Sequence, residues 1–81
     1  MPAVQTRSLH EIAAEIRKSW PKPYFGAVPY LNAMVTLDSM SDHYGLDPAR
    51  EIVIYFLANA QTWKGDVARR VKAELKAMLK G

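Results

Sequence analysis

Residues 52–58 are a run of seven apolar side chains, Ile-Val-Ile-Tyr-Phe-Leu-Ala, and they follow the pair Asp47-Pro48. This pair is typical of a helix start, with Asp47 as the N-cap and Pro48 as the first helical residue. We therefore expect a helix over about 48–60. The run would also suit a strand, but alanines at 49, 58 and 60 and the absence of a partner strand favour the helix. Because this helix is apolar on every side, neighbouring helices, another subunit or both must wrap it.

Two further helices are predicted before this run. Ser8 and Glu11 match a capping box, and the helix that they start is ended by Pro21 and Pro23. Its apolar stripe consists of Leu9, Ile12, Ala13, Ile16 and Trp20. The next helix is expected over residues 29–44, with Pro29 in its first turn and Gly45 as its stop. It carries one broad apolar face, consisting of Tyr30, Ala33, Met34, Leu37, Met40 and Tyr44.

Leu31 and Val35 lie on a second face of that helix, about 100° away from the first. An amphipathic helix needs only one apolar face, so the second predicts a further contact, either inside the fold or across a dimer. A last helix begins near Thr62 or Asp66 and ends before Gly81. Its apolar stripe consists of Val67, Val71, Leu75 and Met78.

These elements predict an all-α fold, a single small four-helix domain over residues 8–80 around the central helix, after a flexible N-terminal arm at 1–7. An 81-residue chain has a small core, and the absence of cysteine leaves no disulfide to support it. Its apolar fraction of 49% is high for such a small domain. We therefore expect self-association, as an isologous dimer.

The charges are unevenly placed, since residues 61–81 carry six basic and two acidic side chains of a chain whose net charge is +3. In the last helix the spacing of three, four and four residues predicts one basic face, formed by Arg69, Lys72, Lys76 and Lys80. With Lys64, this row could contact the phosphates of a nucleic acid; it could also be a solvated face or meet an acidic protein. The row has no Asn, Gln or Ser for base edges, so sequence-specific recognition is not expected. Arg70 lies off the row and is expected to pair with Asp66 and Glu74.

The segment Trp20–Gly26 contains three aromatic residues and two prolines and predicts a stiff turn. Its aromatic side chains could fill the core at a helix corner, as Trp63 could, or form an exposed patch for binding a peptide. The candidate interaction surface comprises Trp20, Tyr24, Phe25, Leu31 and Val35.

No arrangement typical of an enzyme is found. His10 and His43 have no serine or carboxylate placed for a catalytic triad, and Asp38 with Asp42 lacks the third ligand of a cation site. Gly65 alone does not make a phosphate-binding loop. We expect no enzyme activity, no metal and no cofactor.

The N-terminus has no apolar signal segment, and the longest uncharged stretch, residues 23–37, is shorter than the roughly 18 residues of a membrane span. We therefore expect a cytoplasmic protein without a membrane contact.

Several segments resemble a family of small, uncharacterised bacteriophage and prophage proteins. They are residues 23–30 (PYFGAVPY), 37–39 (LDS), 44–45 (YG), 54–60 (IYFLANA) and 63–76 (WKGDVARRVKAELK), and together they span most of 8–80. No activity is established for that family, so no catalytic residue is carried over. The resemblance implies a phage origin and a life inside a bacterial host cell.

The sequence therefore predicts a non-enzymatic interaction protein that binds a host or phage protein, because apolar and aromatic surface is in surplus and chemical motifs are absent. The alternative is an accessory protein that binds nucleic acid through the basic face of the last helix.

Overall fold

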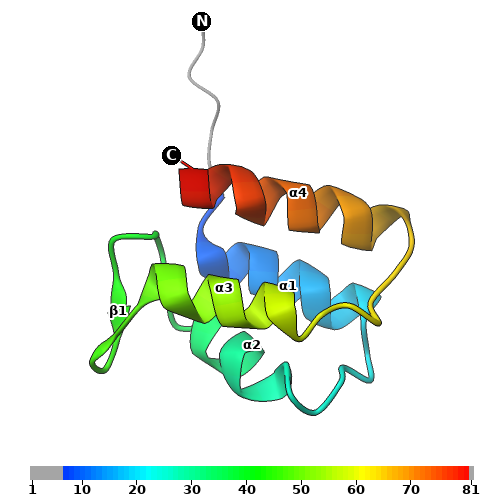
Figure 1. Ribbon diagram of the computed structural model, residues 1–81, viewed down its shortest axis with the longest axis horizontal. Coiled ribbons are helices and arrows are strands. Elements are labelled where there is room, and N and C mark those ends of the chain that lie inside the picture. The colour runs from blue at the N-terminus through cyan, green and yellow to red at the C-terminus, as the bar shows by residue number, and fades with distance from the viewer. Residues whose placement is uncertain (1–6, 81) are drawn as a thin grey trace, which may run out of the picture.

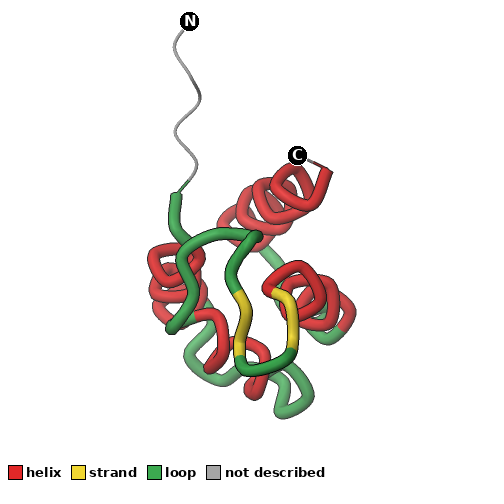
Figure 2. The backbone as a smooth tube through the Cα atoms, turned by 90° about the vertical axis from the view of Figure 1, so that its left-hand side faces the viewer, coloured by secondary structure: helices red, strands yellow, loops and turns green. Residues whose placement is uncertain are grey.

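The structure, a computed structural model, describes residues 7–80 of the chain. It is mostly helical and confirms a small domain with four helices (Figure 1). The elements in chain order are α1 (Leu9–Ser19), α2 (Val28–Met34), β1 (His43–Tyr44), β2 (Asp47–Pro48), α3 (Ala49–Ala58) and α4 (Asp66–Lys80). In the end-on view of Figure 2, α1 and α3 lie on opposite sides, with α4 above them and α2 below. Of the arm predicted for residues 1–7, only Arg7 lies among the described residues.

The predicted capping box of α1 is confirmed. The Ser8 Oγ accepts from the Glu11 N–H, and the Ser8 N–H donates to the Glu11 carboxylate at 3.1 Å. The first two N–H groups of the helix, those of Leu9 and His10, donate at 2.9 Å to main-chain oxygens of the segment that follows α2. The cap of α1 is therefore completed by a part of the chain almost thirty residues away.

The helix predicted over residues 29–44 is wrong in length, because α2 ends at Met34. The chain then leaves the helix, and its polar groups find other partners: the Thr36 hydroxyl donates to the Ala33 oxygen at 2.8 Å. The Asp42 carboxylate accepts from the N–H groups of Asp38 and Ser39. Such local bonds from Thr, Ser and Asp compete with helical ones, and here they hold a loop.

A short hairpin follows that loop, and it also replaces the predicted start of the next helix. His43 pairs with Pro48 and Tyr44 with Asp47, across a turn in which Gly45 has a φ of +63°. Asp47 is therefore a strand residue and not an N-cap; Pro48 itself occupies the cap position of α3. Proline favours an extended conformation in the residue before it, which suits Asp47 in the strand. The run at 52–58 is helical, as predicted.

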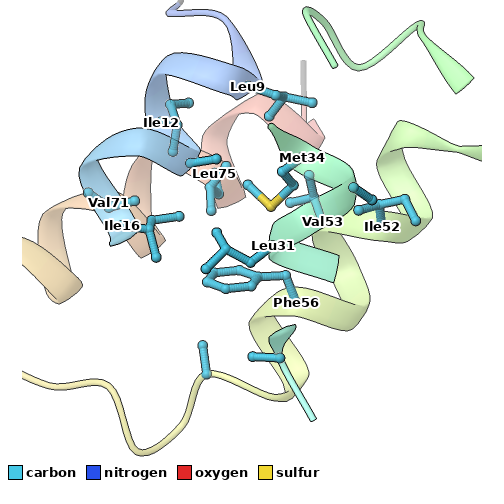
Figure 3. Packing of buried hydrophobic residues seen from close by; sticks show 14 of the residues in the cluster. Leu9, Ile12, Ile16, Leu31, Met34, Ile52, Val53, Phe56, Val71 and Leu75 are labelled. Carbon is cyan, nitrogen blue, oxygen red and sulfur yellow. The ribbon is translucent and has the colours of Figure 1, made fainter. Parts of the chain in front are cut away.

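All four helices contribute to one apolar core (Figure 3). Its largest fully buried side chains are Leu9, Ile12, Ile16, Leu31, Met34, Val53, Phe56, Val71 and Leu75. The predicted stripe of α4 holds: Val71 and Leu75 are buried, and Val67 and Met78 pack against the core. In α3, one side is buried and the other is open to solvent. On the open side, Ile54 and Tyr55 are about half exposed.

Candidate functional surfaces

The basic row predicted on α4 is split by the fold. Arg69, Lys76, Lys80 and the preceding Lys64 are exposed, whereas Lys72 is partly buried. Arg69 lies 2.9 Å from the Asp66 carboxylate, so its charge is partly compensated. Among the members of this row, and within residues 7–80, Lys64, Lys76 and Lys80 are the exposed cations that form no salt bridge.

Lys72 has a partner inside the protein. Its Nζ donates to the main-chain oxygen of Trp63 at 2.7 Å and lies 5.9 Å from the centroid of the Trp63 ring. Burial lowers the pKa of Lys72, and the nearby charges of Lys76 and Lys64 lower it further. Lys72 therefore anchors the loop before α4, a role that its place in the sequence pattern did not indicate.

The pairing predicted for Arg70 is wrong. Arg69, and not Arg70, contacts Asp66, while Arg70 pairs with Glu15 of α1. Arg7 lies 2.8 Å from Glu15 and 2.6 Å from Glu74, which gives a chain of alternating charges between α1 and α4. The bond from Arg70, followed by that from Arg7, holds the pKa of Glu15 below its usual value. These four side chains form a structural network and not a binding site.

The two tryptophans pack on each other. The rings of Trp20 and Trp63 are stacked, with 5.7 Å between centroids and 10° between planes, and both meet Phe56 edge-on. The Trp63 ring N–H also donates to the Ser19 hydroxyl at 3.3 Å. Trp20 thus packs against the core just after the end of α1. The Trp63 ring is buried and does not offer a stacking surface to a nucleic-acid base.

The rest of the predicted interaction surface divides between the core and solvent. Leu31 is 2% exposed and belongs to the core, so its place among the surface residues was wrong. Val35, on the same predicted face, is exposed at the end of α2. Tyr24 and Phe25 are exposed, and their rings contact each other with centroids 4.8 Å apart.

The exposed side of α3 lies next to Tyr24. Ile54, Tyr55 and Ala58 face solvent, and Tyr24 shares a shallow hollow of about 400 Å³ with Ala58, Asn59, Gln61 and Thr62. We call the surface made by Tyr24, Phe25, Ile54, Tyr55 and Ala58 the outer face. Sequence reasoning found the apolar run of α3 but could not tell which of its side chains turn outward, because that depends on where α2 and α4 pack.

A second apolar position lies at the tip of the hairpin. Leu46 is 97% exposed beside Gly45, and Tyr44 is about half exposed on the strand before it. The hairpin lies at the N-terminal end of α3 (Figure 1). Tyr24 instead lies near the C-terminal end of α3, beside Ala58. We call Tyr44 and Leu46 the hairpin tip.

Of the polar side chains considered for chemistry, His10, Asp38 and Asp42 have structural contacts, and His43 is an exposed residue of β1. His10 lies 3.1 Å from Asp38, and Asp42 accepts two main-chain N–H bonds, which lower its pKa. Within residues 7–80, no three His, Cys, Asp or Glu side chains gather where they could hold a metal ion. In the same range, no helix has the length and apolar character needed to cross a membrane.

Comparisons of the chain with protein-family models, with curated proteins and with solved structures found no match.

Proposed function

We propose that the protein is a non-enzymatic interaction protein that acts by binding a host or phage protein in a bacterial cytoplasm. The observation that carries this proposal is the clustering of exposed apolar side chains on the outer face and the hairpin tip. Exposed apolar patches on a small protein are typical of contact sites. The phage resemblance of the sequence supports the setting.

Self-association is part of the proposal. A homodimer would cover the outer face, and α3, which is open on one side in the single chain, would then become the central helix that its apolar sequence predicts. In that case the hairpin tip, at the other end of α3, stays available for the protein partner.

The test compares three purified proteins as bait in a bacterial lysate: the natural chain, Leu46→Ser and Ile54→Lys. A partner that binds the hairpin tip is lost with Leu46→Ser and kept with Ile54→Lys, and it rebinds when both proteins are purified. Helical circular dichroism should be the same for all three, because both changed side chains are exposed. If every captured protein binds all three baits equally, neither apolar surface is the binding site.

A second candidate is an accessory protein that contacts nucleic-acid phosphates, and the exposed Lys64, Lys76 and Lys80 favour it. Binding to a mixed-sequence DNA duplex should weaken steeply with salt, because each phosphate contact releases counterions. The variant Lys76→Glu with Lys80→Glu should abolish this binding. The matched control is Lys18→Glu with Lys22→Glu, which changes the net charge equally at two exposed positions outside α4. Unchanged binding by the variant of Lys76 and Lys80 would exclude the basic face.

A further inference from the structure

We infer that the outer face binds a second copy of this chain. The two copies are related by a two-fold axis that crosses α3 close to Ala58. This inference rests on the proposed role of the outer face as a contact surface, and it adds the occupant and the geometry. Four observations carry it: the shape of the face, the small residue in it, its area and its charge.

The face offers a projection and a hollow that lie next to each other on the same helix. Ile54 and Tyr55 project from the middle of α3, and the Tyr55 ring is braced by Tyr30 at 5.5 Å between centroids. The hollow follows about one helical turn later, beside Ala58 and Asn59. A two-fold axis between the two features places each projection opposite the hollow of the other copy, so both contacts form twice.

Ala58 is the one residue of the outer face with a small side chain, and it lies beside the proposed axis. At a two-fold axis the same residue of both copies comes together. A small side chain there lets two helices approach closely, because the separation of packed helices depends on the side chains at the crossing. Tyr24 and Tyr55 then flank the crossing and exclude water from it.

The area fits one interface of ordinary size. Tyr24, Phe25, Ile54 and Tyr55 are 45%, 79%, 46% and 48% exposed. With roughly 200 Å² for each large side chain, their exposed parts amount to about 450 Å². A standard interface buries about 800 Å² on each partner, a little more than half of it apolar. The face is therefore large enough for the apolar centre of one dimer contact.

Charge does not oppose the contact. Each chain carries +3, yet the residues of the outer face and of the hollow are all uncharged. The charged side chains of α3 are Arg50 and Glu51, which have opposite signs and lie at its N-terminal end. The two-fold arrangement near Ala58 keeps these two charged residues away from the axis and leaves the hairpin tips at the opposite ends of the contact.

The test uses single-cysteine variants. Because the natural chain has no cysteine, any disulfide in such a variant must involve the introduced residue. Ala58→Cys places two thiols near each other across the proposed axis. Ala14→Cys in α1 and Ala77→Cys in α4 are matched controls, since all three alanines are exposed on helices. Under mild oxidation at low micromolar concentration, we expect Ala58→Cys to form a covalent dimer at least about ten times faster than either control. Adding Ile54→Lys should slow it to the rate of the controls.

The solution mass of the cysteine-free chain provides the second measurement. We expect the mass of two chains at high micromolar concentration, and the mass of one chain for Ile54→Lys. Equal oxidation rates at positions 14, 58 and 77, or a natural chain that stays monomeric, would overturn the inference. The lysate experiment judges the proposed function separately, since a partner that depends on Leu46 can bind a monomer.

Discussion

The ammonium group of Lys72 is bound to the main-chain oxygen of Trp63, so a residue that the sequence pattern places in a basic row is tied to the loop before α4. This contact changes how the basic face must be tested. A substitution at Lys72 affects the fold and the charge together, whereas one at Lys76 affects the charge alone.

We therefore expect Lys72→Glu to lower the free energy of unfolding by about 1–2 kcal/mol, because a carboxylate would face the Trp63 oxygen that now accepts a bond. Lys76→Glu, on an exposed position, should change it by less than about 0.5 kcal/mol. Urea unfolding followed by circular dichroism measures both. Equal losses of stability would mean that the Lys72 contact contributes little.

The stacked rings of Trp20, after α1, and Trp63, before α4, should contribute strongly to the stability of the fold. Trp63→Ala removes a buried ring that packs on Trp20 and Phe56, and we expect a loss of about 3–5 kcal/mol in the free energy of unfolding. Trp20→Ala should cost less, because this ring is only partly buried, and Trp20→Phe should recover part of the loss. If Trp20→Ala proves as stable as the natural chain, the stack does not stabilise the fold.

The charge network between α1 and α4 should make stability depend on pH. Since Glu15 has a folded pKa below its ordinary value, it stabilises the fold above that ordinary value. The contribution is lost as the pH falls through the folded pKa. Glu15→Gln should cost about 1 kcal/mol at neutral pH, a small value because the side chain is partly exposed.

The difference between the natural chain and Glu15→Gln should accordingly shrink between neutral pH and about pH 3. Thermal unfolding at several pH values measures it. Glu51→Gln is the comparison: it removes an exposed first-turn charge of α3 that forms no salt bridge in the described residues, so it should change stability less than Glu15→Gln does at neutral pH. A difference that grows in acid would contradict the assigned role of Glu15.

A side chain at Gly26, in the loop between α1 and α2, should disturb the outer face. A Cβ at this position would lie 2.6 Å from a ring atom of Tyr24 and 2.7 Å from the Asn59 Oδ1, both inside van der Waals contact. Gly26→Ala should therefore displace Tyr24 and cost about 1–2 kcal/mol. It should also slow the oxidation of Ala58→Cys, since Tyr24 lines the hollow beside Ala58. A Gly26→Ala variant with unchanged stability and oxidation would contradict this close packing.

Sequence reasoning succeeded where the deciding contacts are local. The capping box of Ser8 and Glu11 joins residues three apart, and the stripe of α4 follows from one period. It failed over residues 35–48, where the deciding contacts are distant. The main-chain oxygens of Leu37 and Asp38 accept hydrogen bonds from the first N–H groups of α1. In a helix over residues 29–44, the same oxygens would accept bonds from N–H groups of that helix.

The same limit applies to the candidate surfaces. Helical spacing placed Leu31 and Val35 on one face, but the packing of α2 buries the first and exposes the second. The spacing of α4 grouped Lys72 with Lys76, yet only the loop at Trp63 determines which of them has a bonding partner. Patterns along a helix identify faces, and the neighbouring elements decide what each face meets.

The bonds from the Leu9 and His10 N–H groups to the segment after α2 have a consequence for slow hydrogen exchange. These two amides belong to α1, but their protection is controlled by the loop that leads to the hairpin. When that loop opens, they should exchange together with its own amides, while the later amides of α1 stay protected. The first turn of α1 thus reports the opening of a segment to which it does not belong, and these two amides form one cooperative unit with that segment, separate from the later turns of the helix.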